Sequence, residues 1–125
     1  MVMSQLEAYG EMQKAGLTDR ELEASVLTKA ALRLKECRDN WDDDNNMKLD
    51  KALRYNQQIW SIFQSELLRE DNTLPNQLKF NILQLSVFVD KRTFEVMAYP
   101  SPEKLTIMIN INLNLAAGLR MKNDA

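Results

Sequence analysis

The side chains best suited to chemistry in this 125-residue sequence are a single cysteine, Cys37, and a run of acidic and amide residues at positions 42–46. The sequence contains no histidine, which removes the imidazole base of serine and cysteine hydrolases and the commonest ligand of zinc sites. Cys37 falls on an apolar helical stripe, where a cysteine is more often a small core residue than a nucleophile. We therefore expect no catalytic residue and no enzyme activity.

A metal or nucleotide site is also not expected. Asp42, Asp44 and Asn46 imitate the opening of a calcium-binding loop. The sixth position of that loop is Met47, where glycine is required, and the twelfth is Leu53, where glutamate is required. The glycines are widely separated, and none precedes a lysine at the spacing of a phosphate-binding loop. The pattern favours a solvated turn and predicts neither a metal nor a cofactor.

Size and charge point to one domain over residues 1–125, with a frayed tail at 119–125. The 16 basic and 18 acidic residues give a net charge of −2, too small to attract phosphate backbones or anionic lipids. No apolar run is long enough to cross a membrane, and the first residues do not resemble a secretion signal. We expect a cytoplasmic protein without direct nucleic-acid or membrane partners.

Apolar residues recur every three or four positions through most of the sequence, which predicts an all-α fold, a compact single-domain bundle of about five helices. A capping box, Thr18 with Glu21, is expected to open the second helix, and Pro75 to open the fourth. The expected helices cover approximately residues 4–15, 18–41, 47–70, 75–98 and 102–118.

The fourth expected helix is apolar on almost every side between Leu78 and Val89, which predicts that it is buried at the centre of the bundle. The fifth is less distinct, because residues 107–115 alternate like a strand. A lone strand has no second strand to pair with, so we expect a helix that Gly118 closes.

Two amides, Asn56 and Asn112, lie at the centres of apolar stripes, where an unpaired amide costs about 1–3 kcal/mol. They therefore require hydrogen-bond partners. In the favoured interpretation they bond to each other or to nearby backbone and fix the helix register. In the alternative they contact a bound helix.

Several short blocks of sequence, spread over nearly the whole chain, carry a resemblance to a known family. The blocks are Ala8-Tyr9-Gly10, Arg20-Glu21-Leu22-Glu23-Ala24, Ala52-Leu53-x-Tyr55-Asn56-Gln57-x-Ile59-Trp60, Leu74-Pro75-x-x-Leu78, Leu85-x-x-Phe88-Val89, Arg92-Thr93 and Ile111-Asn112-x-Asn114-Leu115-Ala116-x-Gly118-Leu119. In these residues and their order, the sequence resembles the flagellar biosynthesis regulator FlaF family.

The resemblance implies a cytoplasmic regulator of flagellum biogenesis that acts with the regulator FlbT on flagellin expression and binds flagellin before export. We expect a groove beside the third and fifth helices to hold a flagellin helix. The candidate partner-binding residues are Tyr55, Asn56, Trp60, Met108 and Asn112.

Two other functions stay open at this point: a post-transcriptional regulator that binds flagellin mRNA, and a generic dimeric helical adaptor. The interspersed charges argue against the first, because RNA-binding proteins present a basic face with aromatic residues. The sequence does not fix the oligomeric state.

Overall fold

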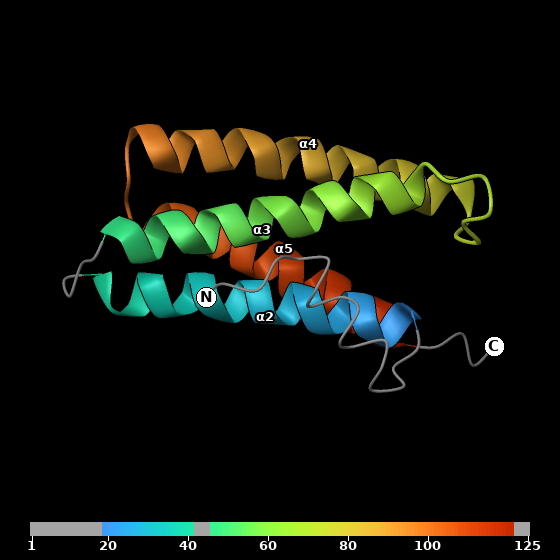
Figure 1. The fold of residues 1–125 in the computed structure, drawn as a ribbon, viewed down its shortest axis with the longest axis horizontal. Coiled ribbons are helices and arrows are strands. Elements are labelled where there is room, and N and C mark those ends of the chain that lie inside the picture. Colours follow the sequence, from blue (N-terminus) through green and yellow to red (C-terminus); the bar gives the residue numbers. More distant parts are fainter. Residues whose placement is uncertain (1–18, 42–45, 122–125) are drawn as a thin grey trace.

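The computed structural model describes residues 19–41 and 46–121, and every regular element in these two segments is a helix. The four helices are α2 (Asp19–Asp39), α3 (Asn46–Leu67), α4 (Asn76–Ala98) and α5 (Glu103–Arg120) (Figure 1). The predicted all-α class is confirmed, with four helices in the described segments. The remaining expected helix, 4–15, lies outside the described residues, as do Thr18 of the capping box and Asp42 and Asp44 of the acidic turn.

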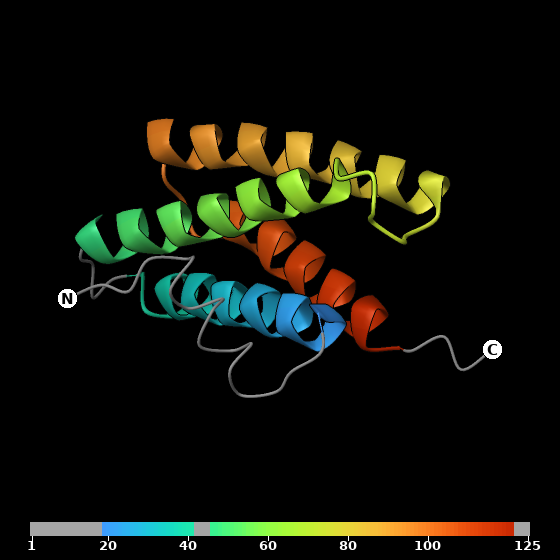
Figure 2. The ribbon, with the colours of Figure 1, turned by 45° about the vertical axis from the view of Figure 1, so that its right-hand side comes forward.

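The helices α2, α3 and α4 lie roughly side by side, and α5 crosses behind them at an angle (Figures 1 and 2). The most extensive packing is between α2 and α5, and α3 contacts α2 on one side and α4 on the other. Small buried residues, Ala24, Ala30 and Ala31 on α2 and Ala116 on α5, shorten the distance between helices that meet through them. The core is therefore built around α2, α3 and α5.

Contrary to the prediction, α4 is not the buried central helix. It lies at one edge of the bundle, where it contacts α3 and α5 (Figures 1 and 2). One narrow stripe of α4 is buried, formed by Ile82, Ser86, Val89, Thr93 and Val96. An apolar composition on all sides was expected to mean burial on several sides, yet within the described segments only one side of α4 has helices to pack against.

The segment 107–115 is helical, as expected, in the middle of α5. The C-terminal end of this helix differs from the prediction in two details. Gly118 does not close this helix, which continues to Arg120, and Leu119 is buried against the core instead of belonging to a frayed tail. The apolar face of α5 packs continuously on the bundle, and such packing stabilises a helix more than the propensity of one glycine weakens it.

The connection between α3 and α4 is ordered by Asn72. Its side-chain amide donates to the Glu66 carbonyl at 3.0 Å, and its Oδ1 accepts from the Leu74 backbone N–H at 3.0 Å. Pro75 then precedes α4, and its carbonyl accepts the first helical hydrogen bond, from Lys79. Among the described residues, no helix is long and apolar enough to cross a membrane.

Candidate functional site

The polar side chains at the centre of the bundle form a connected hydrogen-bond network. The Asn112 amide donates to Asn56 Oδ1 at 2.7 Å, and its nitrogen also lies 3.4 Å from the Leu27 carbonyl oxygen. Asn112 Oδ1 accepts from the Trp60 indole N–H at 3.0 Å. The network thus joins α2, α3 and α5.

The favoured interpretation of the two asparagines, as partners of each other and of nearby backbone, is confirmed. Because the bonded atoms are on different helices and fully buried, a shift of one helix along another would break these bonds. The Asn56 side-chain nitrogen has no partner among the described residues, so the network is incomplete at that one atom.

The five residues predicted to contact a partner are all buried in the core. Tyr55 is 7 % exposed, and the exposed fraction of Trp60, Asn56, Met108 and Asn112 is 0 %. The structure brings Asn56, Trp60 and Asn112 together, whereas Met108 Sδ lies beside Thr93 Oγ1 of α4 at 3.7 Å. The groove expected beside α3 and α5 at these residues is filled by the side chains themselves. A partner contact by any of the five stays a prediction that would require the bundle to open.

Tyr55 is the one member of this set at the edge of the core. Its ring lies under two cations of α2, with the Arg33 guanidinium carbon 4.3 Å and Lys29 Nζ 5.9 Å from the ring centre. Its hydroxyl is buried and has no hydrogen-bond partner among the described residues. Burial raises the pKa of Tyr55 above its usual value of 10.0, and Arg33 opposes that rise.

Replacing Tyr55 by phenylalanine is expected to raise the free energy of unfolding by about 1 kcal/mol, because it removes a buried hydroxyl that lacks a partner and keeps the ring under Arg33. The raised pKa predicts a second effect. The folded state favours the neutral form of Tyr55. Its contribution to the free energy of unfolding of the wild type is therefore fully present below pH 10, and it is lost as the pH rises through the folded-state pKa of Tyr55. Urea unfolding of both proteins between pH 8 and 11 measures this. A Tyr55→Phe variant less stable than the wild type at pH 8 would contradict the account.

Among the described residues, several exposed large apolar side chains lie on α4, on the side that faces away from the core. Phe80, Val87 and Phe94 are 55 %, 67 % and 64 % exposed. They are seven residues apart, or about two helical turns, and therefore lie in one line along the helix. Val87 and the buried Val89 are about 200° apart around the axis, so this line points away from α3 and α5. We call Phe80, Val87 and Phe94 the outer stripe.

The outer stripe has mixed edges. Leu83 and Asp90 flank Val87 on one edge, and Gln84 and Lys91 flank it on the other, as their spacing of three or four residues requires. From Phe80 to Phe94 the stripe covers 15 residues, which corresponds to a rise of about 21 Å along the helix. A line of exposed aromatic and aliphatic side chains with a polar rim is typical of a protein-binding surface. The seven-residue spacing of Phe80, Val87 and Phe94 is present in the sequence, but this apolar segment was expected to lie in the core.

Comparison with known proteins decides the family. A family model described as flagellar protein FlaF matches residues 5–119, which is most of the chain. The chain belongs to the FlaF family. No curated protein and no solved structure matches it. Membership indicates a role in flagellar biogenesis, so the buried network and the outer stripe are features of a FlaF protein.

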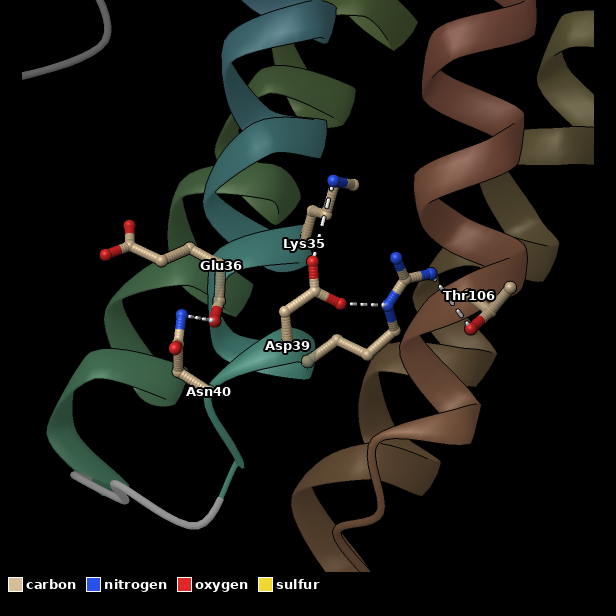
Figure 3. Close-up of polar contacts among 6 residues, drawn as sticks. Lys35, Glu36, Asp39, Asn40 and Thr106 are labelled. Carbon is tan, nitrogen blue, oxygen red and sulfur yellow. Dashed lines mark hydrogen bonds and ion pairs between the residues drawn. The ribbon is translucent and has the colours of Figure 1, made fainter.

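A second polar cluster of this FlaF chain lies at the end of α2 (Figure 3). Asp39 accepts from Arg38 Nε at 3.0 Å and lies 3.5 Å from Lys35 Nζ, and Arg38 also donates to Thr106 of α5 at 3.3 Å. The hydrogen bond from Arg38 is the main reason that the pKa of Asp39 is lowered. The part-buried hydrogen bond from Arg38 to Thr106 links the end of α2 to α5, whereas the contacts of Asp39 lie within α2. No group of acidic or cysteine side chains in the described part of the chain could hold a metal ion.

A shallow depression lies between α2 and α3 of this FlaF chain. Its empty volume is about 240 Å³, including space open to solvent, and its lining residues are Glu23, Val26, Ile59, Ile62, Phe63 and Glu66. Most of these apolar side chains are almost fully buried, so the depression offers a partner little apolar surface. The outer stripe is therefore the candidate functional site.

Proposed function

We propose that this protein binds flagellin in the cytoplasm as a secretion chaperone and supports flagellin synthesis and export together with FlbT, without catalysing a reaction. The observation that carries the proposal is the outer stripe on α4, an exposed apolar surface in a chain of the FlaF family. Flagellin and FlbT are the partners that the sequence resemblance implies.

The shape of the outer stripe suits an amphipathic helix. Partner helices are recognised through anchors repeated every three, four or seven residues, and the stripe repeats at seven. Its length of about 21 Å accommodates four turns of a partner helix. Phe80 and Phe94 at the two ends supply the large aromatic contact area that dominates binding energy in such interfaces.

The rim of the stripe supports a soluble, reversible complex. Asp90 and Lys91 lie on opposite edges near its centre, so a partner helix with charges on both sides of its apolar face can pair with each of them. Exposed pairs of this kind add little affinity but fix orientation. Apolar helical segments of an unassembled flagellin would be shielded on this surface until export.

The test is size-exclusion chromatography of the purified chain mixed with the flagellin of the same organism, held monomeric at low concentration. We expect the two proteins to elute together in one peak ahead of each protein alone. Separate elution, with the purified chain at a concentration that would saturate a micromolar interaction, would overturn the flagellin-binding proposal.

A further inference from the structure

We propose that residues 4–15 fold back as a helix onto the depression between α2 and α3 and cover it. These residues lie outside the described segments, and the helix is predicted from an apolar face of Leu6, Tyr9 and Met12, three residues apart. The depression lies where α3 meets α2, whereas the outer stripe lies on α4, which packs on another side of α3 (Figure 1). This contact within the chain is independent of flagellin binding and goes beyond the proposed function.

The first turns of α2 are covered on more than half of their circumference. Leu22, Glu23 and Ala24 are 0 %, 8 % and 0 % exposed. Because successive residues of a helix point about 100° apart, three buried residues in a row span about 200°. At the described positions 32–36 of the same helix, Leu34 is the only buried residue. The start of α2 is therefore covered more widely than its second half.

The additional cover lies on the outer line of α2. Leu22, Lys29 and Arg33 are seven and eleven residues apart, so they point in nearly the same direction. Lys29 and Arg33 are exposed and lie over the Tyr55 ring at the edge of α3. Leu22 points the same way and is fully buried. A segment other than α3 and α5 is therefore expected over Leu22.

Three stretches of the chain lie outside the described residues, and 1–18 is the one suited to this position. It joins the start of α2 directly, whereas 42–45 follow the opposite end of that helix. Residues 122–125 contain no large apolar side chain. The apolar face of residues 4–15 supplies the kind of side chain that can bury Leu22 and the apolar lining of the depression.

The length of the segment matches the depression. Between residue 15 and Asp19 the chain extends about 14 Å at most. Glu23, the first lining residue along α2, is about 6 Å from Asp19, which is within that reach. A helix over residues 4–15 is about 18 Å long. Folded back along α2 from Asp19, it passes Val26 and ends near the level of Lys29.

The charges at the two ends of the segment agree with this direction. Folding back brings Glu7, near the N-terminal end of the segment, toward the exposed Lys29 and Arg33. It brings Lys14, near the other end, toward Glu66, a half-buried carboxylate of the depression whose described ion pair is long, at 3.9 Å. Exposed pairs of this kind add little stability, but they favour one orientation over its reverse.

Thiol labelling of Val26→Cys in the full chain tests the cover. Val26 lines the depression and is 3 % exposed. Adding Tyr9→Lys is expected to speed labelling at position 26 at least about tenfold, because a lysine cannot be buried unpaired against apolar side chains and the segment would open. Glu11→Lys is the matched control, since it introduces a lysine on the opposite face of the expected helix. Labelling that Tyr9→Lys does not change, or that both substitutions speed equally, overturns the proposal.

Cys37 reports whether the whole chain opens in these variants. It is half-buried and lies 11 residues from Val26 along α2, or about 17 Å. Its labelling rate is expected to be the same with and without Tyr9→Lys. An equal rise at both cysteines would mean global unfolding and would contradict a local cover.

Disulfide cross-linking in the full chain tests the position of the segment without disturbing its apolar face by a charge. Under mild oxidation, Met12→Cys is expected to form an intramolecular disulfide with Ile62→Cys, which lies in the depression. The control pair is Met12→Cys with Val87→Cys, because Val87 is 67 % exposed on α4. Mass spectrometry of the digested protein distinguishes these bonds from any that involve Cys37. Cross-linking of the control pair as readily as the first pair, or of neither pair, overturns the proposed docking site.

Discussion

Replacing Trp60 by alanine is expected to lower the free energy of unfolding by about 4 kcal/mol, the middle of the range for truncating a large buried aromatic side chain. Trp60 is fully buried, and its ring lies 5.9 Å from that of Phe63. Its loss would leave a cavity and remove the donor to Asn112 Oδ1. Since a domain of this size is stable by about 5–15 kcal/mol, urea unfolding should show a strongly lowered midpoint.

Trp60→Phe is the matched control for the polar part of this effect. It retains an aromatic ring in the cavity but removes the indole N–H, so Asn112 Oδ1 loses its partner. The free energy of unfolding of Trp60→Phe is expected to lie between those of the wild type and Trp60→Ala. If Trp60→Ala cost less than about 1.5 kcal/mol, the assignment of Trp60 to the centre of the core would be contradicted.

The core could be predicted from the sequence because its signals are local. The spacing of apolar residues every three or four positions places Leu105 and Ile109 on one face of a helix, and both are buried. The expectation that a buried amide needs a partner led from Asn112 to Asn56. Which of several possible partners each amide would choose depends on how the helices cross, which spacing alone does not give.

The position of α4 could not be predicted in the same way. Apolar residues all round a helix indicate burial only if neighbours cover every side, and the number of neighbours depends on the arrangement of the whole bundle. Here α4 has neighbours on the side of Val89, and Val87 on the opposite side has none among the described residues. The apolar residues of α4 therefore form two separate stripes, one facing the core and one facing the surface.

The sequence did not show where the predicted binding residues would lie. Tyr55, Trp60 and Asn112 were expected to line a groove beside the third and fifth helices. They are equally suited to a core in which the amides bond to one another, as they do here. Family membership was recognisable from the sequence blocks, but a family does not by itself identify a surface.

Replacing Val87 by aspartate is expected to weaken flagellin binding about thirtyfold, or by about 2 kcal/mol. Val87 is the centre of the outer stripe and is 67 % exposed in the free chain, so the substitution should leave the fold unchanged. In the complex it would place a carboxylate against an apolar helix, where an unpaired charge loses its hydration.

The most direct test of the central claim, that the outer stripe binds flagellin, is a titration of labelled flagellin followed by fluorescence anisotropy. The titrants are the wild type, Val87→Asp and Leu32→Asp, each checked for folding by circular dichroism. Leu32→Asp is the matched control, because Leu32 is 55 % exposed on α2, outside the outer stripe. We predict the same dissociation constant for the wild type and Leu32→Asp, and one about thirtyfold higher for Val87→Asp. Equal dissociation constants for all three proteins would contradict the claim, because the stripe would then contribute nothing to binding.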